Sequence, residues 1–563
     1  MKTRQAGIAD IKQNPQFSVL IVGAGVNGIG TFRDLALQGV DVLMVERGDF
    51  CSGASMASSH MLHGGIRYLE NAEFRLVQEA LAERNRLLRN APHYAKPLPT
   101  TIPMYKLFSG VLNAPLKFLG LLDRPSERGA LIIKLGLIMY DAYVRGDSPM
   151  PSHRFHTRKQ ALDKWPALNP EIRYTATYYD GAMPTPERLC IDMIDDTEAM
   201  EARAVALNYC SLVGIEDGKA VLRDEQTGEQ ITVQTQVLVN AAGPWIDIVN
   251  DRLSRQTTFI GGTKGSHLIL DNPDLRQAIG DHEFFFENDD GRIVLIFPFG
   301  DKVQVGSTDI RIDNPDEAQC TEEEEQYILT MIPKIFPDIP VDASQIIYKF
   351  SGVRPLPSSG TGFTGQISRD HHIETVEAEN RVPFPILSLV GGKWTSFRAF
   401  AEEVTDTVLD RLGRTRSAST ADLPIGGGRN FPVRDEDQYR WAVTLAGETG
   451  LSVLRLRTLL TRYGTRAGDL ARFLVAEEDR LLQSLPDYSC REVLYLVRTE
   501  KTVHLDDFLL RRSLIAWLGK VNSPLLEELA VIFGGEFGWS PEVCSTEIER
   551  AKAILAEKHG VRL

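Results

Sequence analysis

One segment near the start of the chain restricts the possible folds more than any other. Residues 18–23 read SVLIVG, a continuous apolar run of the kind that forms a parallel strand buried on both faces. The run passes into a glycine-rich turn, residues 23–28 (GAGVNG), and the apolar residues that follow have helical spacing up to Gly39. A second apolar run over residues 40–45 closes at Glu46. This order predicts one β-α-β unit within about 30 residues.

Each glycine of a G-x-G-x-x-G turn has a physical task. The first allows the tight bend, the second lets the backbone approach a pyrophosphate, and the third lets helix and strand pack closely. Gly23, Gly25 and Gly28 occupy these positions at the start of a helix, whose free N–H groups attract an anion. Glu46 stands 18 residues beyond Gly28, where an acidic side chain grips a ribose hydroxyl. The segment predicts a dinucleotide site; the alternative is an ordinary tight turn with a surface Glu.

The G-x-G-x-x-G spacing alone is weak evidence for a dinucleotide site, since 46 glycines among 563 residues give roughly 0.3 copies by chance. A second copy over residues 360–365 does occur, but it follows a Pro- and Ser-rich stretch instead of a buried strand, so we interpret it as a glycine-rich loop. The turn does not separate NAD from FAD. Residues 52–59 (SGASMASS) suit close contact with an extended cofactor, because their small side chains admit backbone and hydroxyl contacts. A flexible surface linker is the alternative.

Charge, cysteine content and length exclude several classes of protein. The chain carries 62 Lys and Arg against 76 Asp and Glu, a net charge of −14 that opposes bulk attraction to nucleic acid. Six scattered cysteines without a C-x-x-C pair indicate reduced thiols in a cytoplasmic chain and no zinc site. Residues 1–17 lack the apolar centre of a secretory signal, and residues 130–144 are too short to span a bilayer. The length suggests about three or four folding units.

Motifs further along the chain carry a resemblance to a known family. They are SGASMASSHMLHGGIRYLE (52–70), EALAER (79–84), NAAGPW (240–245), KGSH (264–267), GSTD (306–309), SGVRPL (351–356), SRD (368–370) and GGKWTSFR (391–398). In this order they resemble the FAD-dependent glycerol-3-phosphate dehydrogenases, which are D-amino-acid-oxidase-like flavoenzymes. The stretch 505–512 (LDDFLLRR) also resembles the C-terminal helical domain of that family. The resemblance covers residue 18 to the C-terminus.

The resemblance implies an α/β fold with three parts. A Rossmann-like FAD-binding domain, of the D-amino-acid-oxidase and glutathione-reductase type, is interleaved with an antiparallel-sheet substrate domain, and an all-helical C-terminal domain follows. Helical periodicity rich in Leu, Arg and Glu from residue 436 onward supports the last part independently. We predict an FAD-binding domain over 18–85, 155–260 and 350–410, a substrate-binding or cap domain over 86–154 and 261–349, and a helical domain over 420–563.

The activity implied by the resemblance is oxidation of sn-glycerol 3-phosphate to dihydroxyacetone phosphate, with electrons passed to quinone. Oxidising a secondary alcohol requires a hydride acceptor, a base or relay for the hydroxyl proton, and a clamp for the donor carbon. The flavin N5 of FAD takes the hydride, so no metal is needed. Three alternatives stay open: a glycerol-3-phosphate oxidase that uses O₂, an amine or amino-acid oxidase, and a non-catalytic flavin-binding sensor.

A dianionic phosphate is held best by the planar fork of Arg, to which Lys adds a point charge. By the resemblance, the substrate-binding candidates are Arg67, Tyr68, Arg354, Arg369 and Lys393, and Arg354 and Lys393 are also catalytic candidates. His267 is the candidate general base or proton relay, because imidazole accepts a proton near neutral pH. Asp309 either orients a base or caps a turn. His60 stands where members of the family carry Lys, so a cationic role there depends on pH.

Three strand-to-turn segments are expected to converge on the cofactor. Small residues after the run at 236–239 let the chain pass beneath a dinucleotide. A helix that opens near Thr395 would stabilise negative charge at the pyrimidine edge of the flavin. An ordinary strand-to-helix turn is the alternative at both places. The predicted cofactor-binding residues are Gly23, Gly25, Gly28, Glu46, Ser52, Ser58, Ser59, His63, Gly64, Gly65, Val213, Ala241, Gly243, Trp245, Gly392, Lys393 and Thr395.

Quinone reduction requires contact with a bilayer through a local basic or apolar face. One candidate face is the set of arginines at positions 455, 457, 462, 466 and 472, interleaved with leucines. The other is Arg511 and Arg512 beside Leu509 and Trp517; the alternative in both cases is a solvated helical face packed on the first domain. We expect a homodimer in the cytoplasm, peripheral on the inner face of the cell membrane, without a nucleic-acid partner.

Overall fold

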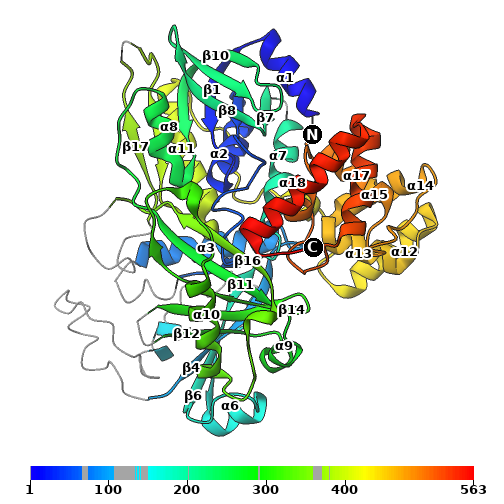
Figure 1. The fold of residues 1–563 in the computed structure, drawn as a ribbon. Helices are drawn as coiled ribbons and strands as arrows, with labels where there is room; N and C mark the ends of the chain where they lie inside the picture. The colour runs from blue at the N-terminus through cyan, green and yellow to red at the C-terminus, as the bar shows by residue number, and fades with distance from the viewer. Residues whose placement is uncertain are drawn as a thin grey trace, which may run out of the picture.

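The predicted β-α-β unit forms the centre of the first of two sheets. The computed structural model describes all residues except 1, 66–73, 107–132, 135, 139, 141–149, 201, 289–291, 359–369 and 380. Figure 1 shows one sheet with the N-terminal helices at the top, a second sheet below it, and the C-terminal helices (orange to red) along one side. The predicted fold class, a mixed α/β fold with a helical C-terminal domain, is confirmed.

In the first sheet, a run of parallel strands ends at one edge in the parallel strand β7 and at the other in the antiparallel strand β17. Within the described residues the order is β17-β18-β10-β1-β2-β7, and the hairpin β8–β9 pairs with β10. Every residue of β2 and β18 is buried, as expected for parallel strands covered on both faces. The strands are β1 (Gln16–Val22), β2 (Val42–Val45), β7 (Ala204–Leu207), β8 (Cys210–Glu216), β9 (Lys219–Asp224), β10 (Gln230–Asn240), β17 (His372–Val376) and β18 (Ile386–Val390).

Helices cover the first sheet and place the glycine turn at its edge. Helix α2 (Val26–Leu37) packs between α7 (Pro186–Glu198) and α11 (Phe397–Arg411). Gly30 allows the close approach to α11, because a Cβ at this position would lie 2.9 Å from the Phe397 ring. Helix α3 (Phe74–Asn90) contacts α11 and the turn after β18. The remaining helices of this lobe are α1 (Arg4–Gln13) and α8 (Ile246–Arg252).

The second sheet is mainly antiparallel, as the resemblance implied for the substrate domain. Its order is β15-β11-β14-β13-β12-β4-β6-β3, with β16 against β11 and β5 against β6. The strands are β3 (Met61–Leu62), β4 (Lys96–Met104), β5 (Arg154–Thr157), β6 (Tyr174–Ala182), β11 (Thr263–Leu270), β12 (Glu283–Glu287), β13 (Ile293–Phe299), β14 (Lys302–Gly306), β15 (Ile310–Arg311) and β16 (Ile346–Arg354). Its helices are α6 (Arg158–Lys164), α9 (Pro273–Ile279) and α10 (Glu322–Ile335).

The strand pairing bears on the predicted domain ranges. β5 and β6 fall within 155–260 or at its edge, a range that we assigned to the FAD-binding domain, yet they pair into the second sheet. The short β3 also joins that sheet, although it belongs to the first predicted range. The chain therefore crosses between the two sheets more often than the predicted ranges allow. The ranges themselves stay predictions.

The C-terminal part is helical, as its sequence periodicity indicates. Four of its described helices end at glycines with positive φ, a conformation that favours glycine: Gly450, Gly464, Gly538 and Gly560. Helix α18 reaches back to β16 of the second sheet, so this domain contacts the body of the molecule (Figure 1). The helices are α12 (Asp435–Thr449), α13 (Val453–Tyr463), α14 (Ala467–Val475), α15 (Cys490–Thr499), α16 (Leu505–Asp507) with a π-helical turn over Phe508–Arg512, α17 (Ser523–Phe537) and α18 (Pro541–His559).

The predicted membrane face around Arg511 is wrong. Arg511 and Arg512 are only 5% and 1% exposed, and both Leu509 and Trp517 are fully buried. The arginines of the other predicted face form ion pairs with acidic side chains of the protein. These pairs are Arg455 and Arg462 with Glu492, Arg457 with Asp435, Arg466 with Asp192, Asp195 and Asp196, and Arg472 with Glu448 and Asp469. Within the described residues, no helix combines the length and the apolar character needed to cross a bilayer.

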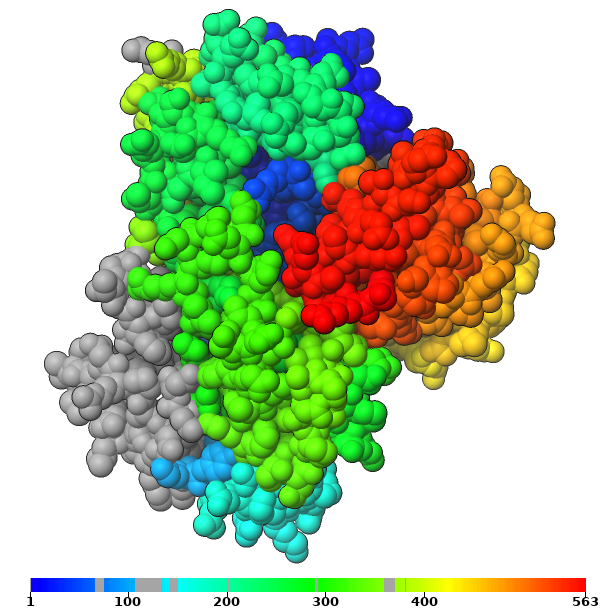
Figure 2. All heavy atoms as spheres, in the orientation of Figure 1, coloured from blue at the N-terminus to red at the C-terminus, as the bar shows by residue number. Residues whose placement is uncertain are grey.

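The C-terminal helices meet both sheets beside a recess in the surface. Figure 2 shows N-terminal residues (blue) at the bottom of this recess, between the sheets (green) and the C-terminal helices (red). Residues of the N-terminal lobe that follow β2 therefore lie close to a domain more than 400 positions away in the chain, as the contact of Asp49 with Arg512 at a separation of 463 positions confirms.

A buried ion pair fixes the second sheet to the helix behind it. Lys264 on β11 donates from Nζ to Glu324 Oε2 of α10 at 2.7 Å, and both side chains are less than a tenth exposed. Ser266 and Thr308 donate their hydroxyl groups to the other oxygen of Glu324, at 2.9 and 2.6 Å. Lys264 of the KGSH motif thus has a structural contact that holds β11 in place.

We expect Lys264→Met to destabilise the protein by about 3–5 kcal/mol, because it leaves the Glu324 carboxylate buried without its cation. The matched control is Lys302→Met on the neighbouring strand β14, whose 2.9 Å pair with Asp271 has a half-exposed partner and should contribute about 0–1 kcal/mol. Thermal unfolding of the two variants compares these effects. Equal melting temperatures for the two variants would contradict the structural role of Lys264.

Candidate functional site

The glycine turn after β1 has the geometry that a dinucleotide phosphate needs. Gly23 has φ +104° and lies against the next crossover, since a Cβ would be 2.6 Å from the Ala241 carbonyl oxygen. A Cβ on Gly28 would be 2.1 Å from the Gly23 carbonyl oxygen, which any larger residue would displace. Gly25 caps α2 and meets only Ser55 Oγ, at 3.2 Å from its would-be Cβ. Backbone therefore approaches closely at Gly23 and Gly28, whereas Gly25 at the start of α2 faces a single side-chain oxygen.

Glu46 stands at the end of β2, on the same edge of the sheet. Its carboxylate accepts hydrogen bonds from the Ala24 N–H at 2.9 Å and the Gly48 N–H at 3.0 Å. Burial raises the pKa of Glu46 above its ordinary value of 4.5, against the effect of these two N–H groups. Each carboxylate oxygen keeps a second acceptor site, so the side chain retains the capacity to bind a ribose hydroxyl.

The small-residue segment 52–59 connects the two sheets. Ser55 accepts from the Val26 N–H at 2.9 Å, and its carbonyl accepts from Trp394 Nε1 at 2.8 Å. Further along, a Cβ on Gly352 of β16 would lie 2.7 Å from Ala57 Cβ, and Ser59 Oγ is 3.1 Å from His267 Nε2. The segment is therefore a close-packed strip that runs from the dinucleotide turn to the second sheet, and the alternative of a free surface linker is wrong.

The other predicted turns lie at the same edge of the first sheet. The segment after β10 begins with Ala241, and Gly243 has φ +58° with open space where a Cβ would be. After β18, Gly392 has φ +96° and its would-be Cβ lies 2.9 Å from Asn27 Nδ2 of α2. Thr395 donates its hydroxyl to the His63 carbonyl at 3.2 Å, which ties this turn to the His-Gly-Gly segment.

Three neighbouring strands of the second sheet present one face to this strip. His267 on β11 is opposite Phe350 on β16 and Gly306 on β14. The imidazole is 2% exposed and stacks on Phe350 with 4.9 Å between ring centroids. Gly306 makes room for the ring, because a Cβ there would be 2.3 Å from His267 Cδ2. The ring position is thus fixed from both sides.

His267 is neutral in this environment. Burial, with a smaller contribution from the charge of Arg354, lowers its pKa from 6.5 to about 3. An imidazole with so low a pKa is a weak base. The pKa therefore does not support the prediction of a general base that titrates near neutral pH. The side chain instead offers hydrogen bonding through one nitrogen to Ser59, while Nδ1 has no hydrogen-bond partner among the described residues.

Arg354 ends β16 on the same face of the sheet as His267. Its guanidinium donates to Asp309 Oδ1, Ser307 Oγ and the Thr308 carbonyl, each at 3.2 Å. It lies across Gly265 of β11, where a Cβ would be only 2.1 Å from Nη2. Asp309 therefore orients the cation and not the imidazole. A guanidinium and a neutral imidazole share one face, a pairing suited to an anionic substrate that carries a hydroxyl.

Not all of the predicted site residues belong to the part of the chain that the structure describes. Arg67, Tyr68 and Arg369 lie outside the described residues, as does the second glycine motif over 360–365. Gly64 N–H donates to Asp180 Oδ1 at 3.0 Å, and Gly65 has φ +75°. The other predicted cofactor-binding residues Ser52, Ser58, Val213 and Trp245 are not fully buried, and the assignment of each to the cofactor stays a prediction.

The structure answers the question of charge at His60. Burial lowers its pKa to about 4, so the imidazole is uncharged at neutral pH. Its ring packs on Trp517 of the C-terminal domain, with 4.8 Å between centroids, and its Nε2 lies 3.0 Å from the Met56 carbonyl. His60 therefore does not supply the positive charge of a Lys in this state; it joins the C-terminal domain to the strip that carries Ser59.

Two features of the site were missed from the sequence. One is the space that Gly265, Gly306 and Gly352 leave for neighbouring groups. A glycine inside a strand is the sequence signal that could have indicated this space. The other is the buried group beneath the His-Gly-Gly turn, where Arg84 donates to Tyr140 Oη at 2.8 Å and to Asp180 Oδ1 at 3.0 Å. No pattern in the sequence identifies the partners of Arg84, because Tyr140 and Asp180 stand 56 and 96 positions further along the chain.

Comparisons with known proteins agree with this geometry. Residues 18–382 match the family described as FAD dependent oxidoreductase, and residues 418–544 match the C-terminal domain of alpha-glycerophosphate oxidase. The chain is 31% identical to a glycerol-3-phosphate dehydrogenase of Synechocystis sp., with 96% of each chain covered. It is 30% identical to the D-erythritol 1-phosphate dehydrogenase of Brucella abortus, with 88% of this chain and 93% of that relative covered.

A solved structure shares the fold. The X-ray structure of the glycerol-3-phosphate dehydrogenase from Bacillus halodurans, complexed with FAD, matches with a TM-score of 0.75 at 22% identity. The match covers 98% of this chain and 97% of that one. Fold and site together define a flavoprotein oxidoreductase with two sheets and a helical C-terminal domain. The chain belongs to the FAD-dependent oxidoreductase family, and the predicted family and cofactor are confirmed.

The residues present fit FAD. Gly23, Gly25 and Gly28 leave a helix N-terminus open to the pyrophosphate, and Glu46 retains acceptor sites for the ribose. When bound, FAD supplies the hydride acceptor. The protein would contribute position and electrostatics, through the turn after β18 and through the face of the second sheet that carries Arg354 and His267.

We expect His267 to stay neutral between about pH 5 and about pH 8, since its pKa in the folded protein is about 3. The imidazole NMR signal assigned by its loss in His267→Gln should not shift across this range. Because the unfolded chain binds the proton near pH 6.5, this residue lowers stability as pH falls below 6.5, by roughly 1.4 kcal/mol per pH unit. A titration midpoint near 6.5 in the folded enzyme would refute the neutral assignment.

Proposed function

We propose that the enzyme oxidises sn-glycerol 3-phosphate to dihydroxyacetone phosphate, with hydride transfer to the N5 atom of FAD. The observation that carries this proposal is the guanidinium of Arg354, held over Gly265 on the sheet face where His267 lies. A dianionic phosphate binds a guanidinium through paired charge-assisted hydrogen bonds. Relatives named glycerol-3-phosphate dehydrogenase, which align with nearly the whole chain, support the same donor.

The chain's own residues divide the work of binding and proton movement. Arg354 holds the phosphate, and Asp309 keeps the guanidinium in position through its 3.2 Å contact. Lys393, Arg67, Tyr68 and Arg369 stay proposals for the same anion or for the flavin carbonyls. His267 passes the hydroxyl proton on by hydrogen bonding with Ser59 and does not hold it, because its pKa is far below neutral.

The electron acceptor and the assembly belong to the same proposal. We propose quinone as the acceptor, reached by peripheral contact of a cytoplasmic homodimer with the inner face of the membrane. Burial of Arg511 and Arg512 excludes that face from the contact, whereas Arg457 and Arg472 of the other face have side chains that are 39% and 59% exposed. Reduction of a quinone analogue without peroxide formation tests the acceptor, and stoichiometric peroxide would favour an O₂-using oxidase. Sedimentation of the holoenzyme tests the homodimer.

Anaerobic mixing of the holoenzyme with glycerol 3-phosphate tests the donor. Loss of the visible absorbance of oxidised FAD is expected with this compound and not with glycine or sarcosine, which lack the phosphate that Arg354 would bind. D-Erythritol 1-phosphate is the informative competitor, because a relative at 30% identity is named for it. Faster bleaching by the four-carbon phosphate would replace the proposed donor. No bleaching by any donor would favour a flavin-binding sensor.

We expect Gly265→Ala to weaken substrate affinity as Arg354→Lys does, because the new methyl group displaces the guanidinium whose Nη2 lies 2.1 Å from that position. Loss of a charged hydrogen bond predicts a rise in apparent KM of about 10- to 100-fold. The matched control, Arg311→Lys on the exposed end of the neighbouring strand β15, should leave KM unchanged. Unchanged KM in Gly265→Ala and in Arg354→Lys would remove Arg354 from the clamp.

A further inference from the structure

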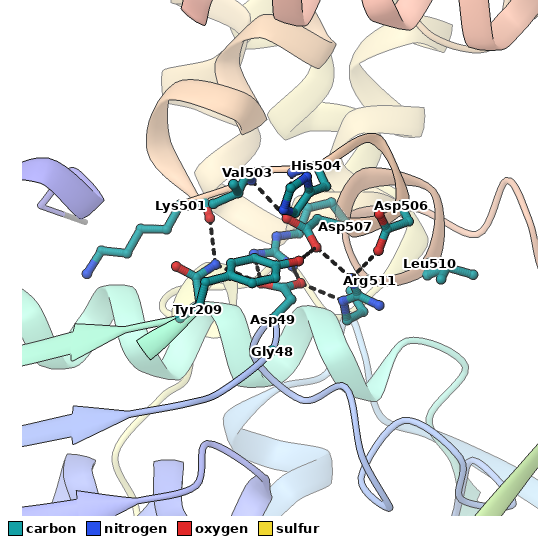
Figure 3. A network of polar contacts seen from close by, with 12 residues as sticks. Gly48, Asp49, Tyr209, Lys501, Val503, His504, Asp506, Asp507, Leu510 and Arg511 are labelled. Atoms are coloured by element: carbon teal, nitrogen blue, oxygen red, sulfur yellow. Dashed lines mark hydrogen bonds and ion pairs between the residues drawn. The ribbon is translucent and has the colours of Figure 1, made fainter. Parts of the chain in front are cut away.

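The loop after β2 is fixed by the C-terminal domain. Asp49, three positions beyond Glu46, is 1% exposed and accepts from two arginines of the π-helical turn that follows α16. Arg511 donates from Nε at 2.5 Å, and Arg512 donates from Nη2 at 3.0 Å and also from Nη1. Figure 3 shows Asp49 and Arg511 pointing toward each other where the two parts of the chain meet.

Further contacts hold the two arginines and the loop in place. Arg511 also donates to Asp507 at 2.6 Å, and Tyr209 donates its hydroxyl to the same oxygen at 2.6 Å (Figure 3). Asn208 bridges the domains, because its amide donates to Asp49 at 3.0 Å and to the Lys501 carbonyl at 2.8 Å. Burial would raise the pKa of Asp49, but the two guanidinium groups hold it well below its ordinary value.

A short chain of contacts leads from these arginines to the dinucleotide site. Gly48 precedes Asp49, and its N–H donates to Glu46 Oε1 at 3.0 Å. The Gly48 carbonyl accepts from the Tyr209 N–H at 2.8 Å, and two positions after Asp49 the Cys51 N–H donates to the Ala24 carbonyl at 2.9 Å. The position of Asp49 therefore determines both the orientation of the Glu46 carboxylate and the fit of the loop against the glycine turn.

We propose that Asp49, Arg511 and Arg512 are positioning residues for FAD, so that the C-terminal domain determines how tightly the flavin is held. The inference rests on the flavin site and not on the identity of the alcohol that is oxidised. Arg is required because its planar fork reaches both oxygens of Asp49, whereas Lys offers a single point charge. The helical domain then belongs to the cofactor site although it is expected to touch no part of the ribose itself.

The test compares Arg512→Lys with Arg466→Lys in the full-length holoenzyme. Arg466 makes a similar cross-domain contact, to Asp192 at 3.0 Å and to Asp195 and Asp196 at 2.7 Å. Within the described residues these acidic partners all lie on α7, and none lies in the loop after β2. The readouts are FAD content per chain after gel filtration, release of FAD on dilution, measured by its fluorescence, and the melting temperature. We expect Arg512→Lys to release FAD about tenfold faster, with Arg466→Lys close to the parent protein.

The melting temperature separates a positioning role from a general loss of stability. If both variants lose FAD in proportion to their melting temperatures, or if neither loses FAD, the inference is overturned. Should Arg512→Lys fail to fold, Asp49→Asn, which keeps the shape of the side chain, takes its place with the same readouts and the same criterion. Because FAD retention is measured without substrate, failure of the glycerol 3-phosphate assignment does not affect this result.

Discussion

Parallel pairing of four strands is the constraint on which the rest of the site depends. Val22 at the end of β1 is in register with Val45 of β2 and Asn240 of β10, and Asn240 is in register with Ser388 of β18. The carboxyl ends of these strands, where ligands bind in open α/β sheets, therefore meet at one edge. The glycine turn, Glu46, Ala241 and the turn after β18 come from segments that span more than 340 positions of sequence, yet the register places them side by side.

Glycines on three strands of the second sheet leave space for groups that pack against this sheet. Three adjacent strands each have a glycine on the face turned toward the small-residue strip, and each glycine admits a different group: Gly265 the Arg354 guanidinium, Gly306 the His267 ring, and Gly352 Ala57. A residue with a Cβ at any of these places would collide with that group. The arrangement of groups on this face thus depends on the three glycines as much as on the charged residues. Close approach of another group is a common reason for glycine inside a strand.

The sequence predicted the elements that follow from local pattern and missed those that follow from distant contact. The strands at 18–23 and 40–45 and the C-terminal helices were recognised because buried runs and helical periodicity are local signals. β4 was missed because Pro97, Pro99 and Pro103 argue against a strand, although it pairs with β6 along its length. Arg511 and Arg512 were one of two candidates for a membrane face, because no local signal reveals that Asp49, more than 460 positions earlier, is their partner.

That separation has a consequence for the order in which the enzyme is made. Asp49 and Arg512 are 463 positions apart, so at about 5–20 residues per second the ribosome needs roughly half a minute to a minute and a half to add the partner arginine. During this interval the loop that carries Glu46 and Asp49 has left the ribosome, but the two arginines that bind Asp49 have not been synthesised. The nascent chain therefore passes through a stage at which the N-terminal lobe is exposed to the cell with an unneutralised acidic residue at its future domain boundary.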